Sequence, residues 1–402
     1  MASVPPIILL ILATATVVQY SEQGNRYELV AENVRGKNSV DLHQSEAKQS
    51  KLACARLCSS ESHCHGFSYQ KPTKQCHTYA KIISQLETTS VSGYEMWEKS
   101  QVLISGKFGN QVGSIDVFNP HTTSVFTSAM SHSAHTTVAF GKFSDGTVAA
   151  VGGITGALSP LATVNLLHLA NSTMTIGPAS PTGMGYLTAA AMLNDCLYCC
   201  AWYDGSSYRS ECRKLCLNSQ RQLQWDSSVD SLPTTHPFSA MTELGGHLYL
   251  TGGLAVPSGN PMDTAYRYDA FQNKWTTIAS MTLARGQHST ASLDGKVYVC
   301  GGCGPTCLAI NSNAAVYSAC ESYDPVNDSW HVITSLNKPR FKFKMVTFQG
   351  QILAIGGTSH ASGTPTDDVA RSVEVYTPAN NSWADLGVVL PSQRAFHSVV
   401  MV

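Results

Sequence analysis

Nine cysteines between residues 196 and 320 have a spacing that suits more than one kind of chemistry. They form two clusters: Cys196, Cys199, Cys200, Cys212 and Cys216, then Cys300, Cys303, Cys307 and Cys320. In the first cluster, the pattern C-x2-C-x12-C-x3-C approaches that of a four-thiolate zinc site, and the second cluster opens with another CxxC pair. The two halves of the first cluster also fall on an expected strand and its hairpin neighbour, where facing side chains can form disulfides. Zinc binding, disulfides and a redox role are the alternatives.

The beginning of the chain favours disulfides. Residues 7–18 are predominantly apolar, and the small residues Ala13 and Ala15 stand near the end of this stretch, so residues 1–20 are predicted to be a secretory signal peptide. Because the secretory pathway is oxidising, cysteines that enter it are expected in disulfides rather than at zinc. We therefore expect a secreted, extracellular protein with no metal and no cofactor. No later segment offers about 18 consecutive apolar residues, so no membrane span is expected.

The number of cysteines is odd. The chain has 13, so at least one thiol stays free or pairs with another chain to give a covalent dimer. Two pairs within the first cluster leave one sulfur over, and Cys196, Cys199 and Cys200 are the candidates. The pairing within both clusters stays open at this stage.

Three arginines recur at matching positions shortly before expected strands: Arg285, Arg340 and Arg394. One interpretation is a hydrogen-bonding post between strands. The other is contact with an anionic ligand or a sugar acid, because a guanidinium group recognises carboxylates with two parallel hydrogen bonds. Histidines recur at corners of the same kind, at His135, His288 and His397. Such repetition predicts a packing role rather than catalysis or metal binding.

These residues lie in a sequence that repeats itself about every 50 residues. Glycine pairs follow apolar strands in VAAVGG, LYLTGG, VYVCGG and ILAIGG, which end at Gly153, Gly253, Gly302 and Gly357. The first spacing is double, and the gap contains the strand CLYCCAWYDG, in which Cys200 and Ala201 are expected at the glycine positions. Because glycine permits unusual backbone angles and close strand approach, we expect a structural role for these pairs rather than phosphate binding.

A second landmark accompanies the glycine pairs, a tyrosine and a tryptophan seven residues apart. It occurs at Tyr268 and Trp275, at Tyr323 and Trp330, and at Tyr376 and Trp383. Together with the corners that carry Arg or His, this pattern resembles the kelch repeat, whose units are four-stranded blades of a β-propeller. Five complete units are expected. The stretches QVLISGKF and SIDVFNP and the later HSVVMV are predicted to complete a sixth blade, which leaves no open sheet edge.

Four further cysteines stand in a different context near the N-terminus. Residues 45–59 have helix-forming composition, with Ser45 as N-cap, and the strand-like pieces GFSYQ and QCHTYA follow. The pattern Cys54-x3-Cys58-x5-Cys64-x-Gly-Phe-x-Tyr-x6-Cys76 resembles the core of the PAN/apple family. The resemblance implies one helix packed against a small antiparallel sheet, with disulfides Cys54–Cys76 and Cys58–Cys64.

Composition excludes some classes of function. The chain has 26 Lys plus Arg against 27 Asp plus Glu, a formal net charge of -1, so a basic surface for nucleic acid is not expected. Three Asn-x-Ser/Thr sites, at Asn171, Asn327 and Asn380, agree with a glycoprotein. All three are expected in the turn between the third and fourth strands of their blades.

The expected architecture is mainly β: a signal peptide at residues 1–20, a small α+β PAN/apple domain at 24–98 and a six-bladed kelch-type β-propeller at 100–402. This layout favours a secreted, non-enzymatic recognition or adhesion protein, for instance in an extracellular matrix. It would bind extracellular protein or glycan through the apple module and through propeller loops such as 255–263 and 358–368. The alternative is an extracellular carbohydrate-active enzyme, similar to the mutarotase and oxidase members of the kelch family, with its site in the propeller channel. A cytoplasmic adaptor is disfavoured by the expected signal peptide and the cysteines.

Overall fold

A computed structural model divides the chain into two compact units, one of residues 1–101 with 119–124 and one of residues 102–118 with 125–402. In residues 1–100 it describes only strands: β1 (Glu22–Gln23), β2 (Arg26–Tyr27), β3 (Leu42–Ala47), β4 (Gly66–Gln70), β5 (Gln75–Tyr79) and β6 (Tyr94–Glu98). The other described residues are 101–105, 113–120, 124–132, 139–155, 159–168, 173–185, 189–305, 315–359 and 368–402.

The strands of the first unit form two antiparallel sheets. Strand β1 pairs with β2, and the other four strands are ordered β3-β5-β4-β6. The predicted strands GFSYQ and QCHTY correspond to β4 and β5. The predicted helix does not begin at Ser45, because Ser45 lies within β3 and pairs with His77 of β5. Residues 48–59 and the predicted pairings Cys54–Cys76 and Cys58–Cys64 involve side chains outside the described residues, so they stay predictions.

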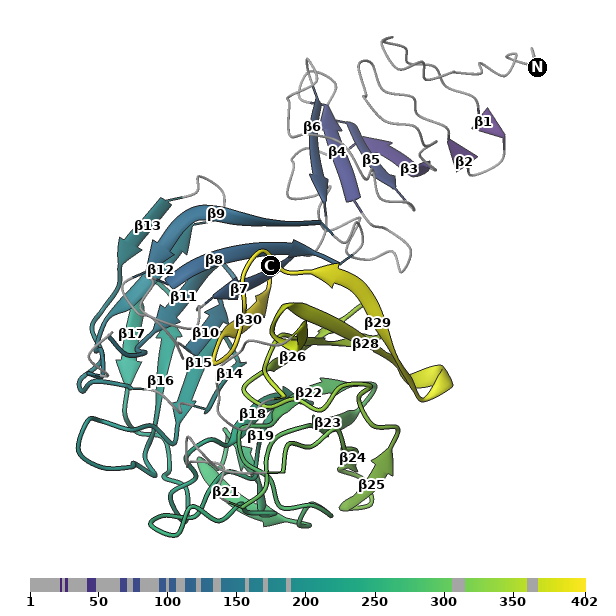
Figure 1. Cartoon of the computed structure of the whole chain (residues 1–402). Helices are drawn as coiled ribbons and strands as arrows, with labels where there is room; N and C mark the ends of the chain where they lie inside the picture. Colours follow the sequence, from purple (N-terminus) through teal and green to yellow (C-terminus); the bar gives the residue numbers. More distant parts are fainter. Residues whose placement is uncertain are drawn as a thin grey trace. The chain divides into compact units, whose positions relative to one another are not determined.

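The second unit consists of six four-stranded antiparallel sheets around a central axis (Figure 1). The prediction of a mainly β, six-bladed propeller is therefore confirmed. The first blade is β10 (Ala139–Lys142), β11 (Thr147–Val151), β12 (Val164–His168) and β13 (Thr173–Ile176). The second is β14 (Ala189–Leu193), β15 (Cys196–Cys200), β16 (Cys212–Leu217) and β17 (Leu223–Asp226). The third is β18 (Ala240–Leu244), β19 (His247–Thr251), β20 (Ala265–Asp269) and β21 (Lys274–Ile278).

The remaining blades follow the same plan. The fourth is β22 (Ser289–Leu293), β23 (Lys296–Cys300), β24 (Cys320–Asp324) and β25 (Ser329–Ile333). The fifth is β26 (Lys344–Phe348), β27 (Gln351–Ile355), β28 (Ser372–Thr377) and β29 (Ser382–Val389), with short 3-10 helices at Asp368–Arg371 and Pro378–Asn380. The sixth is ordered β30 (Ser398–Met401), β7 (Val102–Ser105), β8 (Gly113–Asn119) and β9 (Ser124–His132), so it combines strands from both ends of this unit. This closure protects the strand edges that an open ring would expose.

Burial follows the position of a strand within its blade. In the second strands, such as β23, the last four residues are all buried, because neighbouring blades cover both faces of the sheet. In the fourth strands, burial is partial: Trp275 is the buried residue of β21. The sequence reflects this difference as continuous apolar runs in the second strands and mixed composition in the fourth.

In the third, fourth and fifth blades, the Tyr–Trp pair attaches the blade to the connection that precedes it. Tyr268 and Trp275 face each other on β20 and β21 with ring centroids 5.0 Å apart. The Trp275 indole N–H donates to the carbonyl oxygen of Asp230 at 3.1 Å, and Asp230 belongs to the connection from the second blade. Equivalent bonds in the next two blades join Trp330 to Ala279 and Trp383 to Thr334. A local sequence motif therefore produces contacts between blades.

The first glycine of each pair is required by close packing. Gly252 has φ +54, and a Cβ added there would lie 2.5 Å from the carbonyl oxygen of Arg285. In the second blade β15 continues to Cys200, so the glycine positions correspond to Ala201 and Trp202, one residue later than predicted. Ala201 adopts φ 54, the same left-handed backbone as Gly252. Ala201 therefore keeps the left-handed backbone of the glycine that it replaces in the repeat. This conformation is strained for a residue with a side chain.

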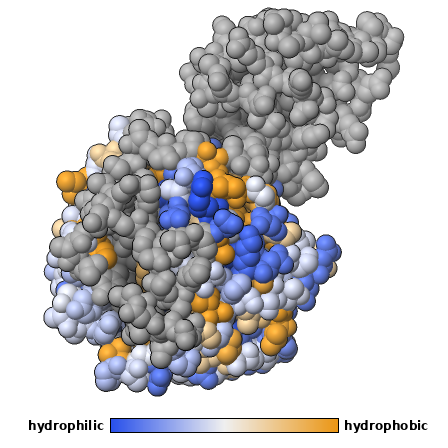
Figure 2. Space-filling view, viewed as in Figure 1, coloured by the Kyte–Doolittle hydropathy of each residue, from blue (hydrophilic) through white to orange (hydrophobic). Residues whose placement is uncertain are grey.

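The alternating strand directions give the propeller two different faces. One, here called the hairpin face, carries the turns between first and second strands, such as 245–246, and between third and fourth strands, such as 270–273. The other, the connection face, carries the loops between second and third strands, such as 252–264, and the segments between blades, such as 279–288. Figure 2 shows apolar residues in separate small groups among hydrophilic ones on the described surface that it displays.

Candidate functional site

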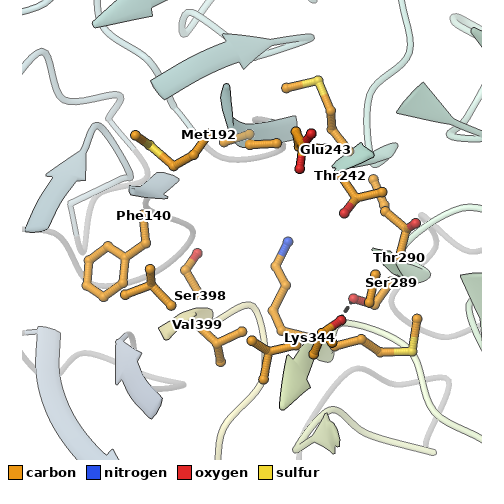
Figure 3. Close-up of a pocket in the computed structure, with 18 of the residues that line it drawn as sticks. Phe140, Met192, Thr242, Glu243, Ser289, Thr290, Lys344, Ser398 and Val399 are labelled. Atoms are coloured by element: carbon orange, nitrogen blue, oxygen red, sulfur yellow. Dashed lines mark hydrogen bonds between the residues drawn. The ribbon is translucent and has the colours of Figure 1, made fainter. Parts of the chain in front are cut away.

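The first strands of the six blades surround a cavity of about 470 Å³ on the propeller axis (Figure 3). Each strand runs from the connection face to the hairpin face, so its first residue lies toward one end of the channel and its fourth residue toward the other. The volume is within the range of small-molecule sites. Between apolar residues the wall carries six hydroxyl groups, those of Thr242, Ser289, Thr290, Ser292, Thr347 and Ser398.

Three charged side chains line this cavity, those of Lys142, Glu243 and Lys344. Lys344 is the first residue of β26, and its ammonium group points into the cavity (Figure 3). Burial lowers the pKa of Lys344. Glu243 is the fourth residue of β18 and accepts a hydrogen bond of 2.8 Å from the Gly246 N–H at the hairpin face. Within the described part of the chain, no acceptor lies at hydrogen-bond or ion-pair distance from the Lys344 ammonium.

A chain of backbone hydrogen bonds runs around the connection-face end of the channel. The residues involved stand two positions before the first strands and have positive φ: Phe238, Gln287, Lys342 and Phe396. The N–H of Gln287 donates to Phe238, that of Lys342 to Gln287 and that of Phe396 to Lys342, at 2.9 to 3.0 Å. Backbones of successive blades approach this closely only near the axis. These residues therefore define the mouth of the channel.

Lys342 is held at this mouth by aromatic rings. Its ammonium nitrogen lies 4.7 Å from the ring centroid of Phe341 and 4.3 Å from that of Phe396. Both distances are within the range of cation–π attraction. Burial lowers the pKa of Lys342 to about 8. Two lysines, Lys342 and Lys344, thus stand at the same end of the channel.

The three predicted arginines lie behind the channel wall and are at most 1% exposed. Arg285 donates to the carbonyl oxygen of Gly301 at 2.8 Å and to Glu321 Oε1 at 2.8 Å. Two further buried ion pairs have the same arrangement, Arg340–Glu374 and Arg394–Asp116. These contacts support the interpretation of hydrogen-bonding posts. Contact with an anionic ligand stays a prediction, and in this structure the guanidinium groups are engaged by protein acceptors.

Histidines occupy two repeated positions beside the arginines. His236 stands at the arginine position of the third blade, and its Nδ1 lies 3.0 Å from the carbonyl oxygen of Gly252, the counterpart of the contact that Arg285 makes in the fourth blade. His288 and His397 directly precede β22 and β30 and are 4% and 1% exposed. Burial is the main cause that lowers the pKa of both well below the ordinary value. Neutral, packed imidazoles agree with the predicted structural role.

Disulfides join facing residues of the second and third strands in two blades. They are Cys196–Cys216, Cys200–Cys212 and Cys300–Cys320, and Cys303 is disulfide-bonded as well. Because three sulfurs of the zinc-like pattern are thereby occupied, they do not provide thiolate ligands for zinc. Cys199 is a free, buried thiol, so of the three candidates for the odd sulfur it is the unpaired one, and it does not belong with the disulfide cysteines. The reason is strand alternation: Cys196 and Cys200 share one side of β15 and Cys199 lies on the other.

The predicted glycosylation sites and loops are divided between the two faces. Asn327 and Asn380 are exposed and lie in turns between third and fourth strands, on the hairpin face. Loop 255–263 lies on the connection face, where the Ala255 N–H donates to the carbonyl oxygen of Asn260 at 2.7 Å. Glycosylation and ligand contact at these places stay predictions. Outside the described residues lie His135, Asn171, Cys307 and residues 360–367.

The channel residues Lys344, Glu243 and Thr290 were missed by the sequence analysis. One signal was available. The first residue of a first strand is Ala240 in the third blade and Ser289 in the fourth, so a lysine at this position departs from the repeat. That its ammonium group points into a cavity follows only from the ring of blades.

Known families match both units. A PAN domain model matches residues 30–96, and a Kelch motif model matches residues 237–282, 284–337 and 339–387, which are the third, fourth and fifth blades. The chain therefore contains a PAN domain followed by kelch repeats that form a six-bladed β-propeller.

Curated relatives share part of the kelch region. Kelch-like protein 23 of Homo sapiens is 26% identical over 179 residues, 44% of this chain and 28% of that protein. An F-box/kelch-repeat protein of Arabidopsis thaliana is 30% identical over 140 residues, 34% of each chain. Beta-scruin of Limulus polyphemus is 30% identical over 179 residues, 42% of this chain and 18% of that protein. The matches thus span about a third or less of the length of these relatives.

The propeller, the PAN domain and the disulfides together indicate a binding module of the extracellular type. None of the helices within the described ranges has the length and apolar character needed to cross a membrane.

Proposed function

We propose that the protein is a secreted, non-enzymatic recognition protein that binds an extracellular protein or glycan through its PAN domain and the connection face of its propeller. The disulfides are the observation that carries this proposal. They tie the second and third strands of two blades together, and such bonds persist in the oxidising secretory pathway rather than in the cytosol.

The connection face is the better candidate for contact with a partner. Asn327 and Asn380 both lie on the hairpin face, so glycans attached there would cover its edge and leave the connection face open. Loop 255–263 is held by internal backbone bonds, including one of 2.7 Å between Gly259 N–H and the Ala255 carbonyl oxygen. A loop that is ordered before binding loses less conformational entropy when a partner binds.

The first test is expression in eukaryotic cells, followed by binding of the purified protein to arrays of glycans and extracellular proteins. We expect export into the medium with intact disulfides and one or more specific ligands. Retention inside the cell with reduced thiols would contradict the proposal.

Two valine variants locate the binding face. Val256, on the connection face, is 42% exposed, and Val326, on the hairpin face, is 89% exposed. Val256→Asp is expected to weaken binding at least tenfold, whereas Val326→Asp is expected to leave it unchanged. The opposite ranking would place the partner on the hairpin face.

The alternative, an extracellular carbohydrate-active enzyme, is favoured by one observation, the presence of Glu243 and Lys344 in one cavity. It predicts turnover of a sugar that Glu243→Gln abolishes. NMR spectra of candidate sugars incubated with both proteins distinguish turnover from binding.

A further inference from the structure

We propose that the propeller channel binds a small monocarboxylate that carries hydroxyl groups, with the Lys344 ammonium as the carboxylate partner and the hydroxyls of β22 as partners for the rest. This site is separate from the loops and the PAN domain, so it does not depend on the recognition function proposed above, and it lies in the cavity considered for the enzymatic alternative.

The unmatched charge of Lys344 is the first observation. Three buried carboxylates already have a cationic partner, because Glu321, Glu374 and Asp116 each pair with an arginine. Glu243 lies about three residues farther along the channel than Lys344, roughly 10 Å at the rise of a β-strand. Lys344 is partly buried, and restricting the access of an ammonium group to water without an anionic partner is unfavourable. A carboxylate that enters the cavity would provide this partner.

An unmatched hydroxyl is the second, independent observation. Thr290, in the wall of the same cavity, is only 7% exposed, and its hydroxyl oxygen has no hydrogen-bond partner in the described part of the chain. The neighbouring Ser289 oxygen accepts a hydrogen bond of 2.7 Å from the Met345 N–H, which leaves its own proton to donate. Ser398, from β30, also lines this part of the cavity (Figure 3). A buried hydroxyl such as that of Thr290 normally has a hydrogen-bond partner, and a hydroxyl group of a ligand would provide one.

Charge and size narrow the class of ligand. The cavity wall carries two lysines, Lys142 and Lys344, and one glutamate, Glu243, which favours a single negative charge over a dianion. A volume of about 470 Å³ suits a small molecule rather than a folded segment. Apolar wall residues, such as Phe140, Met192 and Val399, would contact its carbon atoms.

The two ends of the channel differ in charge, and this indicates the direction of entry. Lys342 and Lys344 lie toward the connection face, whereas Glu243 and Lys142 lie together toward the hairpin face, where their opposite charges offset each other. A negatively charged molecule is therefore attracted more strongly to the first end than to the second. We therefore expect entry through the mouth formed by Phe238, Gln287, Lys342 and Phe396.

Titration calorimetry of the full-length protein with gluconate, a hydroxylated monocarboxylate, tests the site. Sorbitol, its neutral polyol counterpart, and inorganic phosphate serve as comparison probes. We expect gluconate to bind and the other two to bind at least tenfold more weakly. Equal affinity for sorbitol, preference for phosphate, or no heat with gluconate up to about 50 mM would overturn the proposal, since millimolar affinity is the weak limit for such a site.

Variants and chemical protection locate the ligand. Lys344→Met is expected to reduce gluconate affinity at least tenfold and Thr290→Val severalfold, whereas Lys142→Met, at the other end of the cavity, is the matched control and should change it less than twofold. Limited acetylation of the wild-type protein with acetic anhydride gives a test that does not depend on how the variants fold. Mass spectrometry then measures the acetylation of each lysine. Gluconate should protect Lys344 and leave Lys142 unprotected. Equal protection of both lysines, or none, would exclude the site.

Discussion

Arg394 and Asp116 are 278 positions apart in the chain and form a buried ion pair in the blade that closes the propeller. The Arg394 Nε–H donates to Asp116 Oδ2 at 3.0 Å, and both side chains are 0% exposed. Asp116 lies on β8, and Arg394 precedes β30. The pair therefore joins the two ends of the ring at the place where only noncovalent contacts hold the blade together.

Removal of one partner of this pair should destabilise the whole propeller. Arg394→Met leaves a buried carboxylate without its cation, and such changes cost about 3–5 kcal/mol. Urea unfolding measures the free energy difference. The control is Lys338→Met, which breaks an exposed pair with Asp385 at 3.2 Å and should cost at most about 1 kcal/mol. Similar losses in the two variants would show that the closing pair is not critical.

Two glycines with nearly the same backbone conformation should respond differently to alanine. Gly252 (φ +54) and Gly245 (φ +60) are both left-handed, but only at Gly252 would a Cβ meet neighbouring atoms, at 2.5 Å from the Arg285 carbonyl oxygen. Gly245→Ala should cost about 1–2 kcal/mol for the backbone alone. Gly252→Ala should cost about 1–3 kcal/mol more, because the packed blade must shift. Thermal unfolding of both variants compares the two costs, and equal shifts would mean that the clash is relieved without strain.

The free thiol of Cys199 should be inert in the folded protein. Cys199 is buried, and burial raises its pKa to about 12, so almost no thiolate is present at pH 8. Iodoacetamide is expected to label Cys199 only after denaturation without reductant, while Cys196, Cys200 and Cys300 appear in disulfide-linked peptides. Mass spectrometry reads both results. Rapid labelling of native protein at Cys199, or a disulfide that includes it, would contradict the structure.

Acid should destabilise the propeller through its buried histidines. The pKa of His397 is lowered well below 6.5, mainly by burial, so the folded state stays neutral where the unfolded state takes up a proton. Stability is thus fully present above about pH 6.5 and is lost as the pH falls below it, by up to about 1.4 kcal/mol per pH unit for one such group. Urea unfolding between pH 7.5 and 5.5 measures this slope.

A phenylalanine variant isolates the contribution of one histidine. Phe343 precedes β26 as His397 precedes β30, and both are 1% exposed, so the fold already accepts a phenyl ring at this position. His397→Phe should reduce the pH dependence of the unfolding free energy by the contribution of one histidine. The unfolding free energy at pH 7.5 should change only slightly. An unchanged slope would mean that His397 is not the group that titrates.

Much of the fold could be predicted from local sequence. Strand lengths, glycine pairs and the Tyr–Trp spacing recur about every 50 residues, and each reflects contacts within one blade or with the adjacent connection, as Tyr268 and Trp275 illustrate. The six blades followed from these patterns, whereas the disulfides were expected from the predicted signal peptide and from cysteines on facing strands. The predicted boundaries of elements were less accurate. The glycine positions of the second blade were predicted one residue too early, and the predicted helix was begun at Ser45, within β3.

The sequence by itself determined the repeat, the number of blades and the chemistry available to the cysteines, because these depend on residues that are close in the chain. Tertiary structure alone decided which carboxylate neutralises each arginine and that Lys344 points into a cavity. These outcomes depend on side-chain direction and on contacts between residues hundreds of positions apart, such as Arg394 and Asp116. Such contacts exist only once the ring of blades has closed.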